Sequence, residues 1–240
     1  MSSKVTTGPD RGTAGNGAGG APTGGRRLTA DARRRQLFAT ALRLFAERGY
    51  SATTMDDIAE AAGVTKPLLY QHFDSKRALY LELMDVFAGV LVRRIVDATA
   101  DAEGPRQQVE RGFAAYFALM VENEAAFRLL YGREAPADPE LSEARRRVEE
   151  TIAQAIDPLI DAGLDPEHRL LLAHSVVGMA EGAGRHWLER RQSSASGAAD
   201  GDNGTAAGAT MDMDPALEAA TLAIRLADLA WAGLRQVHRT

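Results

Sequence analysis

The sequence predicts an all-α protein of about nine helices, arranged as a small N-terminal unit and a larger C-terminal unit. From residue 30 almost to the C-terminus, apolar residues recur at the three- and four-residue spacing of amphipathic helices. No segment shows a convincing strand pattern, and no internal repeat is present. Glycine and proline divide the periodic segments into helices of ordinary length.

Composition limits the class of protein. The chain has 240 residues, which is enough for one or two domains with a real core. It has no cysteine, which excludes disulfides and cysteine–metal sites. No apolar run approaches the ~20 residues that span a membrane, and the start lacks the apolar segment of a signal peptide. We therefore expect a cytoplasmic protein.

The first segment, residues 1–27, is rich in Gly, Thr, Ala and Pro and has almost no large apolar residue. Such a segment cannot bury enough surface to offset its ordering entropy, so we expect a disordered arm. It ends in Arg26 and Arg27. It is therefore either a solvated tail or an arm that touches phosphates or the minor groove of DNA.

A first helix is expected over residues 30–48, with Gly49 ending it. Its buried stripe consists of Leu37, Phe38, Ala41, Leu44 and Phe45. Arg33, Arg34 and Arg35 lie near its start and span more than half a turn. At most one or two of them can face DNA at the same time, and we expect Arg33 or Arg34 to lie near a phosphate.

Residues 53–79 carry the most specific pattern in the chain, TTMDDIAEAAGVTKPLLYQHFDSKRAL. Thr54 and Asp57 suit the capping box of a first short helix. Gly63 can adopt the positive φ that ends this helix, and Thr65 can cap a second one. A helix-turn-helix of this kind places its second helix in the major groove of DNA.

Side chains on and beside the second short helix can meet DNA. Tyr70 can lay its ring on a sugar and send its hydroxyl to a phosphate, and His72 and Lys76 belong to a strip that can face phosphates. Lys66 can help to set the sequence that is read. The expected DNA contacts are Arg33, Thr54, Thr65, Lys66, Pro67, Leu68, Tyr70, Gln71, His72 and Lys76.

The net charge of −5 is unusual for a DNA-binding protein until it is divided along the chain. Residues 26–77 hold ten Lys and Arg against six Asp and Glu, so they carry +4. Residues 78–240 hold sixteen basic and twenty-six acidic residues, so they carry −10. The basic part coincides with the helix-turn-helix, and screening beyond ~8 Å keeps its attraction for phosphate local.

The helix-turn-helix resembles the DNA-binding domain of the TetR family of bacterial repressors. The resemblance covers residues 30–80, with a looser match of helix order beyond, and Leu68 departs from the small or polar residue usual in the family. It implies a dimer that binds a roughly palindromic operator. The matching residues are Thr54, Ile58-Ala59, Gly63-Val64-Thr65, Leu69-Tyr70, His72-Phe73 and Ser75-Lys76.

The remaining helices follow from periodicity and caps. Pro158 is expected to kink the helix of residues 139–162, and residues 193–213 form a low-complexity loop that we expect to be mobile. The expected domains are 28–76 for DNA binding and 77–240 for regulation and dimerisation. The expected helices are 75–100, 105–122, 124–131, 139–162, 166–191 and 214–238.

The resemblance also implies a ligand pocket among the middle helices. Aromatic and methionine residues there sit at helical spacing, so each is either core or pocket wall, and Tyr116, Tyr131 and His174 are polar groups that can orient a ligand. The charged residues of 105–126 lie near its ends, so we expect a hydrophobic or amphipathic ligand with at most one charge. The expected pocket residues are Phe87, Leu91, Phe113, Tyr116, Phe117, Met120, Tyr131 and His174.

The last two helices are expected to form the homodimer interface. Glycines within a helix cost ~1 kcal/mol each, so their presence in the first of these two helices suggests that another helix packs closely against it. In the resembled family, these helices pair across the dimer into a four-helix bundle. An internal pair of core helices is the alternative. The expected interface residues are Val177, Ala180, Gly184, Leu217, Ile224 and Trp231.

The other sequence motifs do not indicate a cofactor, metal or modification site. The glycine run at residues 15–20 lacks the strand and helix of a dinucleotide site, and the five histidines lack metal-ligand spacing. Asn203-Gly204-Thr205 is a chance glycosylation match. We therefore expect no enzyme, no cofactor and no metal.

The sequence thus favours a repressor whose partners are double-stranded DNA, a second copy and a small ligand, with no membrane partner. Alternatives are a regulator of the same fold without a small-molecule inducer, or a helical enzyme or carrier.

Overall fold

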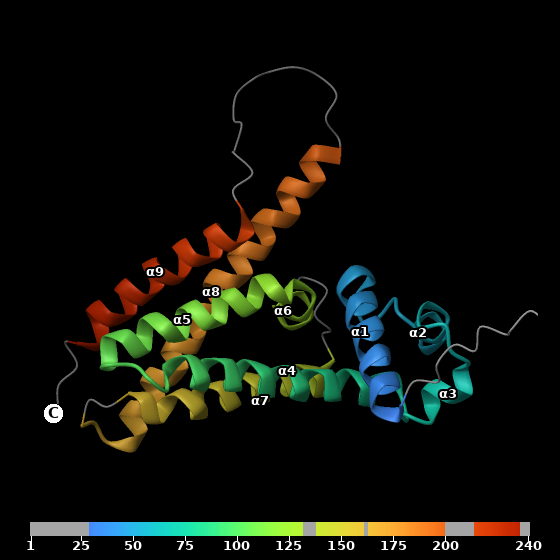
Figure 1. The fold of residues 1–240 in the computed structure, drawn as a ribbon, viewed down its shortest axis with the longest axis horizontal. Coiled ribbons are helices and arrows are strands. Elements are labelled where there is room, and N and C mark those ends of the chain that lie inside the picture. Colours follow the sequence, from blue (N-terminus) through green and yellow to red (C-terminus); the bar gives the residue numbers. More distant parts are fainter. Residues whose placement is uncertain (1–28, 132–137, 161–162, 200–213, 236–240) are drawn as a thin grey trace, which may run out of the picture.

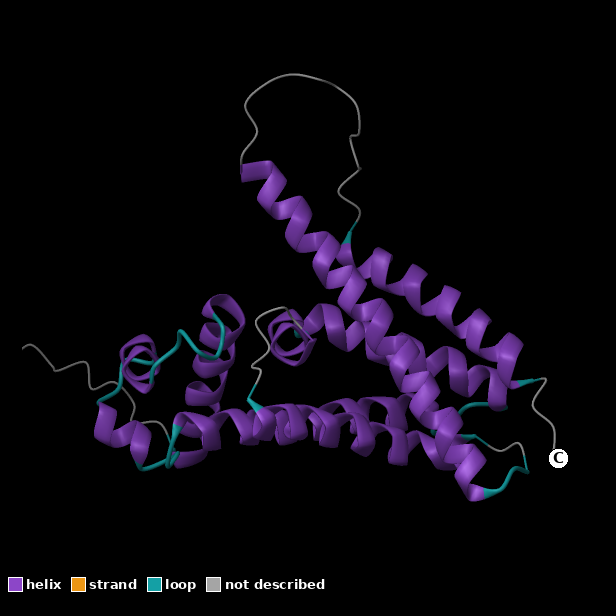
Figure 2. Ribbon diagram, turned by 180° about the vertical axis from the view of Figure 1, so that it is seen from behind, coloured by secondary structure: helices purple, strands orange, loops and turns teal. Residues whose placement is uncertain are grey.

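The computed structural model describes residues 29–131, 138–160, 163–199 and 214–235. Within these ranges it has nine α-helices, one 3₁₀ turn and no strand, so the all-α prediction is confirmed (Figures 1 and 2). The elements are α1 (Ala30–Arg48), α2 (Met55–Ala61), α3 (Lys66–Tyr70), α4 (Lys76–Thr99), α5 (Pro105–Glu122), α6 (Glu124–Tyr131), α7 (Pro139–Ile156), η1 (Asp157–Leu159), α8 (Pro166–Ala199) and α9 (Pro215–Leu234).

Helices α1–α3 cluster at one end of the molecule, and we call them the head (Figure 1). Helices α5–α9, which we call the body, fill the other end. Helix α4 has 24 residues, about 36 Å at 1.5 Å per residue, and runs from the head along the body. Helices α5 and α7 pack against α4, α9 packs against α5, and α6 packs against α1.

Local caps explain where the helices of the head begin and end. The Thr54 side chain accepts from the Asp57 amide at 3.1 Å while the Asp57 carboxylate accepts from the Thr54 amide at 2.8 Å, so the predicted capping box is confirmed. Gly63 has a φ of 65°, a left-handed conformation that favours glycine. The Ser75 hydroxyl accepts from the Ala78 amide at 3.0 Å and begins α4.

Three predicted features of the helices are wrong. Thr65 precedes α3 without making a side-chain capping bond. Helix α7 ends at Ile156 and passes into the 3₁₀ turn, because Pro158 has no N–H to continue the helix, so there is no kinked helix to residue 162. Helix α8 continues to Ala199, through the first part of the loop predicted at 193–213, since that part is rich in Ser and Ala and contains no proline.

Several predictions concern residues outside the described ranges. These are the arm at 1–27 and the loop at 200–213, together with the predicted end of the last helix beyond residue 235. Among the described residues, no helix is both long and apolar enough to cross a membrane.

The junction of head and body is built from aromatic side chains. Tyr80, at 0% exposure, lies edge-on to Tyr50 with ring centroids 5.1 Å apart, and its hydroxyl donates to the Leu129 carbonyl at 3.4 Å. Further along α4, Phe87 meets Phe127 of α6 edge-on at 5.1 Å. Helix α4 therefore contacts the head and α6 through one continuous buried face.

Candidate DNA-binding and effector sites

Helix α3 presents a narrow face to solvent. Leu69 is fully buried against the other head helices, which fixes the rotation of α3 about its axis. Leu68 and His72 are half-buried. The exposed side chains are Thr65, Lys66, Pro67, Tyr70 and Gln71. They include one cation, one aromatic ring and one amide, which is suitable chemistry for phosphate and base-edge contacts.

The ammonium of Lys66 is paired in the free protein. Its Nζ lies 2.8 Å from a carboxylate oxygen of Asp56 on α2, and the hydrogen bond to Asp56 raises the pKa of Lys66. Both side chains are more than half exposed. An exposed pair of this kind is weak and easily exchanged, so DNA can compete with Asp56 for the cation.

Lys76 has a different place from the phosphate strip predicted for it. Its Nζ donates to the carbonyls of Tyr50 and Thr53, both at 2.8 Å, and lies 4.3 Å from the centroid of the Tyr50 ring. Burial lowers the pKa of Lys76. The ammonium therefore holds the α1–α2 connection onto the start of α4.

The Arg34 side chain likewise makes contacts within the protein, joining α1 to the segment that follows α3 and to α4. It donates to the His72 carbonyl at 2.9 Å, pairs with Glu82 of α4, and lies 4.6 Å from the centroid of the Phe73 ring. The Arg33 side chain donates to Gln36 at 2.7 Å within the same helix. Of these two arginines, Arg33 is the better placed to approach DNA.

An apolar cavity of about 80 Å³ lies in the body between α4, α5, α7 and α8. Phe113 and Tyr116 are the two predicted pocket residues that line it. The complete lining is Ile95, Thr99, Gln108, Val109, Gly112, Phe113, Tyr116, Ile152, Ile156, Leu159, Ile160, Val176, Val177, Ala180 and Leu234. The sequence had not indicated the α4 and α7 residues among these.

The other residues predicted for the pocket lie elsewhere. Leu91, Phe117 and Met120 are fully buried core residues that do not border the cavity. Phe87 lines a groove between α1 and α4. His174 is exposed on α8 and cannot orient a ligand in this cavity, so its predicted role is corrected.

Tyr131 belongs to a second hollow, which we call the polar cleft, of about 390 Å³ between α6, α7 and α8. The Tyr131 hydroxyl and a carboxylate oxygen of Glu181 are 3.0 Å apart. Burial, reinforced by the charge of Glu149, raises the pKa of Glu181 to about 7. The cleft is lined by Tyr131, Ser142, Arg145, Arg146, Glu149, Glu181, Arg185 and Glu189.

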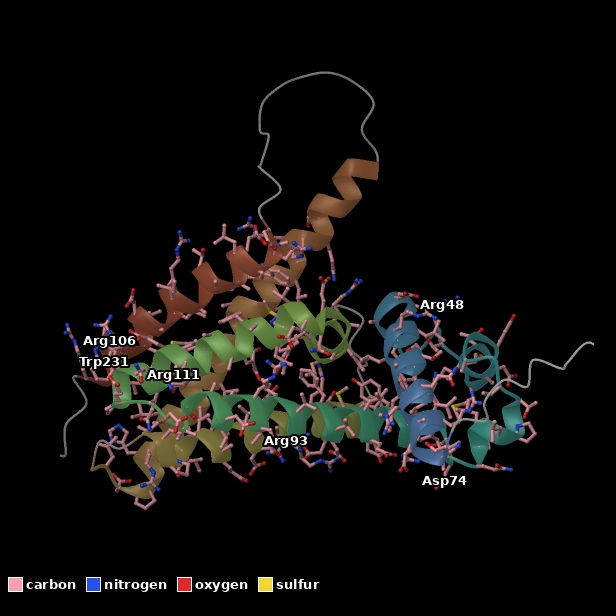
Figure 3. All side chains as sticks on the ribbon, viewed as in Figure 1. Arg48, Asp74, Arg93, Arg106, Arg111 and Trp231 are labelled. Atoms are coloured by element: carbon pink, nitrogen blue, oxygen red, sulfur yellow. The ribbon has the colours of Figure 1, made fainter. Side chains whose placement is uncertain are left out.

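The residues predicted for the dimer interface differ in burial: those of α8 pack inside the protomer, two of α9 are exposed, and Trp231 is half-buried. Val177 and Ala180 face the apolar cavity, and a Cβ on Gly184 would lie 3.3 Å from Met120 Sδ, so these three serve packing within the protomer. Leu217 and Ile224 of α9 are 56% and 64% exposed, and Leu171 of α8 is 62% exposed. Trp231 is half-buried near Arg106 and Pro105 (Figure 3).

Arg77 links the start of α4, next to the head, to the start of α7. Its guanidinium pairs with Asp138, at 2.7 Å, and with Glu140. Asp138 also caps α7 by accepting from the Glu140 and Leu141 amides. Since Ile152 and Ile156 of the same helix line the cavity, one straight element joins the cavity wall to the base of the head.

Comparison with known proteins identifies the family. Residues 37–83 match the model of the bacterial regulatory proteins of the TetR family. The chain is 33% identical to the HTH-type transcriptional activator FasR of Mycolicibacterium smegmatis over 166 residues, covering 68% of this chain and 76% of that protein. The chain belongs to the TetR family.

Other members of the TetR family differ in what they do. The transcriptional repressor KstR2 of Mycobacterium tuberculosis is 36% identical over 105 residues, covering 44% of this chain and 52% of that protein. The fold matches a TetR-like regulator from Rhodococcus sp. RHA1 with a TM-score of 0.63 at 22% identity, covering 88% and 100% of the two chains. It also matches the Bacillus subtilis regulator FadR in complex with stearoyl-CoA, with a TM-score of 0.63 at 15% identity and coverage of 80% and 97%.

Metal chemistry finds no support in the described part of the chain, where no cluster of three or more His, Asp or Glu is arranged to hold an ion. The family consists of transcriptional regulators.

Proposed function

We propose that this TetR-family regulator is a homodimeric repressor that binds a palindromic operator through α3 and is released by an apolar or amphipathic ligand in the body. It would act in the cytoplasm, where bacterial DNA lies. The observation that carries the proposal is the apolar cavity, because its walls include α4, which runs to the head, and α7, which is paired with Arg77 at the start of α4. The expected domain roles, 28–76 for DNA and 77–240 for regulation, fit this division.

The size of the cavity supports a ligand that moves its walls. A water molecule needs about 10–15 Å³ on the same scale, so 80 Å³ holds only about five to eight water-sized groups. A larger apolar molecule would extend out of the cavity or push α7 or α8 outward. The B. subtilis FadR structure contains stearoyl-CoA, an apolar chain with a polar head, which makes an effector of this general kind plausible here.

Outward movement of α7 would pull on the Arg77 pairs with Asp138 and Glu140 and so shift the start of α4. Release follows only if the ligand binds the DNA-incompetent arrangement more tightly than the competent one. A coupling of 1–3 kcal/mol would change operator affinity roughly 5- to 150-fold.

The test is a ligand screen by thermal shift, followed by release of the gene's own upstream DNA. Ala180→Leu fills the cavity and should reduce both the thermal shift and DNA release, while operator binding without ligand persists. Ala118→Leu is the matched control, since Ala118 is exposed on the α9 side of α5 and does not border the cavity. Equal inducer responses in the two variants would contradict the cavity assignment.

A regulator of the same fold without an inducer is the second candidate. The apolar lining argues against it, and DNA binding that no apolar compound alters would favour it. FasR is an activator and KstR2 a repressor, so reporter expression in a deletion strain decides the sign of regulation.

A further inference from the structure

The apolar cavity ends at a hydroxyl that has no hydrogen-bond partner. The ring of Tyr116 lines the cavity, and its Oη is buried and unbonded. The Tyr131 hydroxyl is near enough to affect the pKa of Tyr116, but it does not meet hydrogen-bond geometry with it. Most buried polar atoms have a partner, and an exception indicates strain, function or a missing group.

Tyr116 stands between the apolar cavity and the polar cleft. On α5 the cavity lining runs from Gln108 to Tyr116, and on α8 it ends at Ala180. One turn further along α8, a Cβ on Gly184 would lie 3.6 Å from Tyr116 Oη. The residue after Ala180 is Glu181, whose carboxylate is bonded to Tyr131. The hydroxyl therefore lies at the end of the cavity nearest the polar cleft.

The rest of the cavity lining has few other polar groups that could bind a ligand. Thr99 already donates its hydroxyl to the Ile95 carbonyl at 2.8 Å. Gln108 is half-buried toward the other end of the α5 stretch. Of the hydroxyls on the lining residues, only that of Tyr116 has no hydrogen bond.

The charges nearby decide what kind of group the hydroxyl can bind. Burial raises the pKa of Tyr116 far above its usual value, so the group stays protonated and can donate. The carboxylates of Glu181 and Glu149 raise the pKa of both Tyr116 and Tyr131, and Arg185 lowers that of Tyr116 by less than Glu181 raises it, so the charge that acts most strongly at this end is the Glu181 carboxylate. An anionic head group placed here would meet the same repulsion and would lose its hydration.

We propose that the Tyr116 hydroxyl recognises an uncharged hydrogen-bond acceptor, the carbonyl of an ester, amide or ketone, at one end of an otherwise apolar effector. The inference rests on the proposed function, because it assumes that the apolar cavity is the effector site. The apolar remainder of the effector extends from Tyr116 along Phe113, Val109 and Ile156. Gly184 of α8 lies next to the hydroxyl, since a Cβ there would be in van der Waals contact with Tyr116 Oη at 3.6 Å.

The experiment uses the full chain and three probes of similar length: methyl decanoate, decanoate and undecane. Their dissociation constants are measured by displacement of a polarity-sensitive dye at pH 8. The wild type should bind the ester roughly 5- to 10-fold more tightly than the hydrocarbon, the difference expected for one buried hydrogen bond. Decanoate should bind more weakly than the ester.

Tyr116→Phe keeps the ring and removes the hydroxyl, so it should abolish the preference for the ester and leave undecane binding unchanged. Tyr131→Phe is the matched control, and it should retain the preference. Equal loss of binding for ester and hydrocarbon in Tyr116→Phe would show a merely structural role and overturn the proposal.

The possible outcomes test recognition by Tyr116 and the proposed function separately. If the ester and the hydrocarbon bind the wild type equally, or if decanoate binds best, the recognition by Tyr116 is wrong while the apolar effector site stands. If none of the three probes binds or releases DNA, the proposed function fails and the inference fails with it.

Discussion

Lys76 and Arg34, which hold the head together, donate to backbone carbonyls, whereas three buried side-chain atoms of the body have no hydrogen bond. Lys76, at the start of α4, donates to two carbonyls of the α1–α2 connection, and Arg34 of α1 donates to the His72 carbonyl. The buried side-chain atoms without a hydrogen bond, among the residues that the structure describes, all belong to the body: Tyr116 Oη, Arg145 Nε and Arg191 Nε.

The difference shows which region is complete without a ligand. An unsatisfied buried donor costs about 1–3 kcal/mol, and the head avoids this cost by bonding its own loops. The body keeps it, next to an apolar cavity. Under the proposed function, the head would bind DNA in this arrangement, and the body would gain stability from a ligand.

The largest expected effect tests whether the exposed α9 side chains form the dimer surface. Leu217→Glu combined with Ile224→Glu places two charges on that surface and should give monomers in sedimentation. Loss of the linked second half-site should lower operator affinity by about 10²–10⁴-fold. Val96→Glu, a similar change at an exposed α4 position, should stay dimeric. A folded double variant that remains dimeric removes α9 from the interface.

The second effect concerns readout by the head. Lys66→Ala should lower affinity for the operator by about 5- to 150-fold, as for a base contact of 1–3 kcal/mol. Affinity for DNA of unrelated sequence should fall much less. The measurement is a pair of titrations at one salt concentration, and equal losses on the two DNAs would reassign Lys66 to phosphate.

A substitution of Lys76 tests whether its side chain contacts DNA or stabilises the fold. Because its ammonium holds two carbonyls, Lys76→Met should lower stability by roughly 1–2 kcal/mol and Tm by a few degrees. The dependence of operator affinity on salt should not change. A salt slope reduced by about 1, with Tm unchanged, would restore the phosphate contact predicted from sequence.

The smallest effect is a pH dependence in the body. Glu181 faces Tyr131 of α6, Tyr116 of α5, Glu149 of α7 and Arg185 on its own helix, and its pKa is raised to about 7. A carboxyl whose pKa is raised by folding contributes stability at low pH that is lost as pH rises through the folded pKa.

The wild type should therefore lose more thermal stability between pH 6 and pH 8 than Glu181→Gln, which cannot ionise. Glu189→Gln, at the exposed rim of the polar cleft, serves as the control and should follow the wild type. Identical pH profiles for all three proteins would exclude an ionisation of Glu181 coupled to folding.

Local signals in the sequence predicted the head well. The Thr54–Asp57 capping box, the positive φ of Gly63 and the Ser75 cap depend on residues within three or four positions of one another. The contacts of Arg34 and Lys76 were missed because they join residues far apart in sequence: Arg34 reaches His72 and Glu82, and Lys76 reaches Tyr50.

The cavity lining was harder to predict than the buried faces. Periodicity identified Phe113, Phe117 and Met120 as inward-facing, and all three are buried. Which buried residues border a void depends on how four helices pack together, and that information is not periodic along one helix. Helical spacing therefore could not distinguish Phe113, which lines the cavity, from Met120, which does not.

The contact between α5 and α9 is lined on the α9 side by alanines, namely Ala219, Ala223, Ala227 and Ala230. Methyl groups allow close approach and interlock weakly, so this pair can slide as one packed helix slides on another in a shear motion. Helix α5 is about 10 Å across and carries Tyr116 on the cavity side, while α9 carries Ile224 outward. In the proposed homodimer, an effector and a partner subunit would act on opposite sides of this contact, so ligand occupancy would alter the geometry of the dimer without the head taking part.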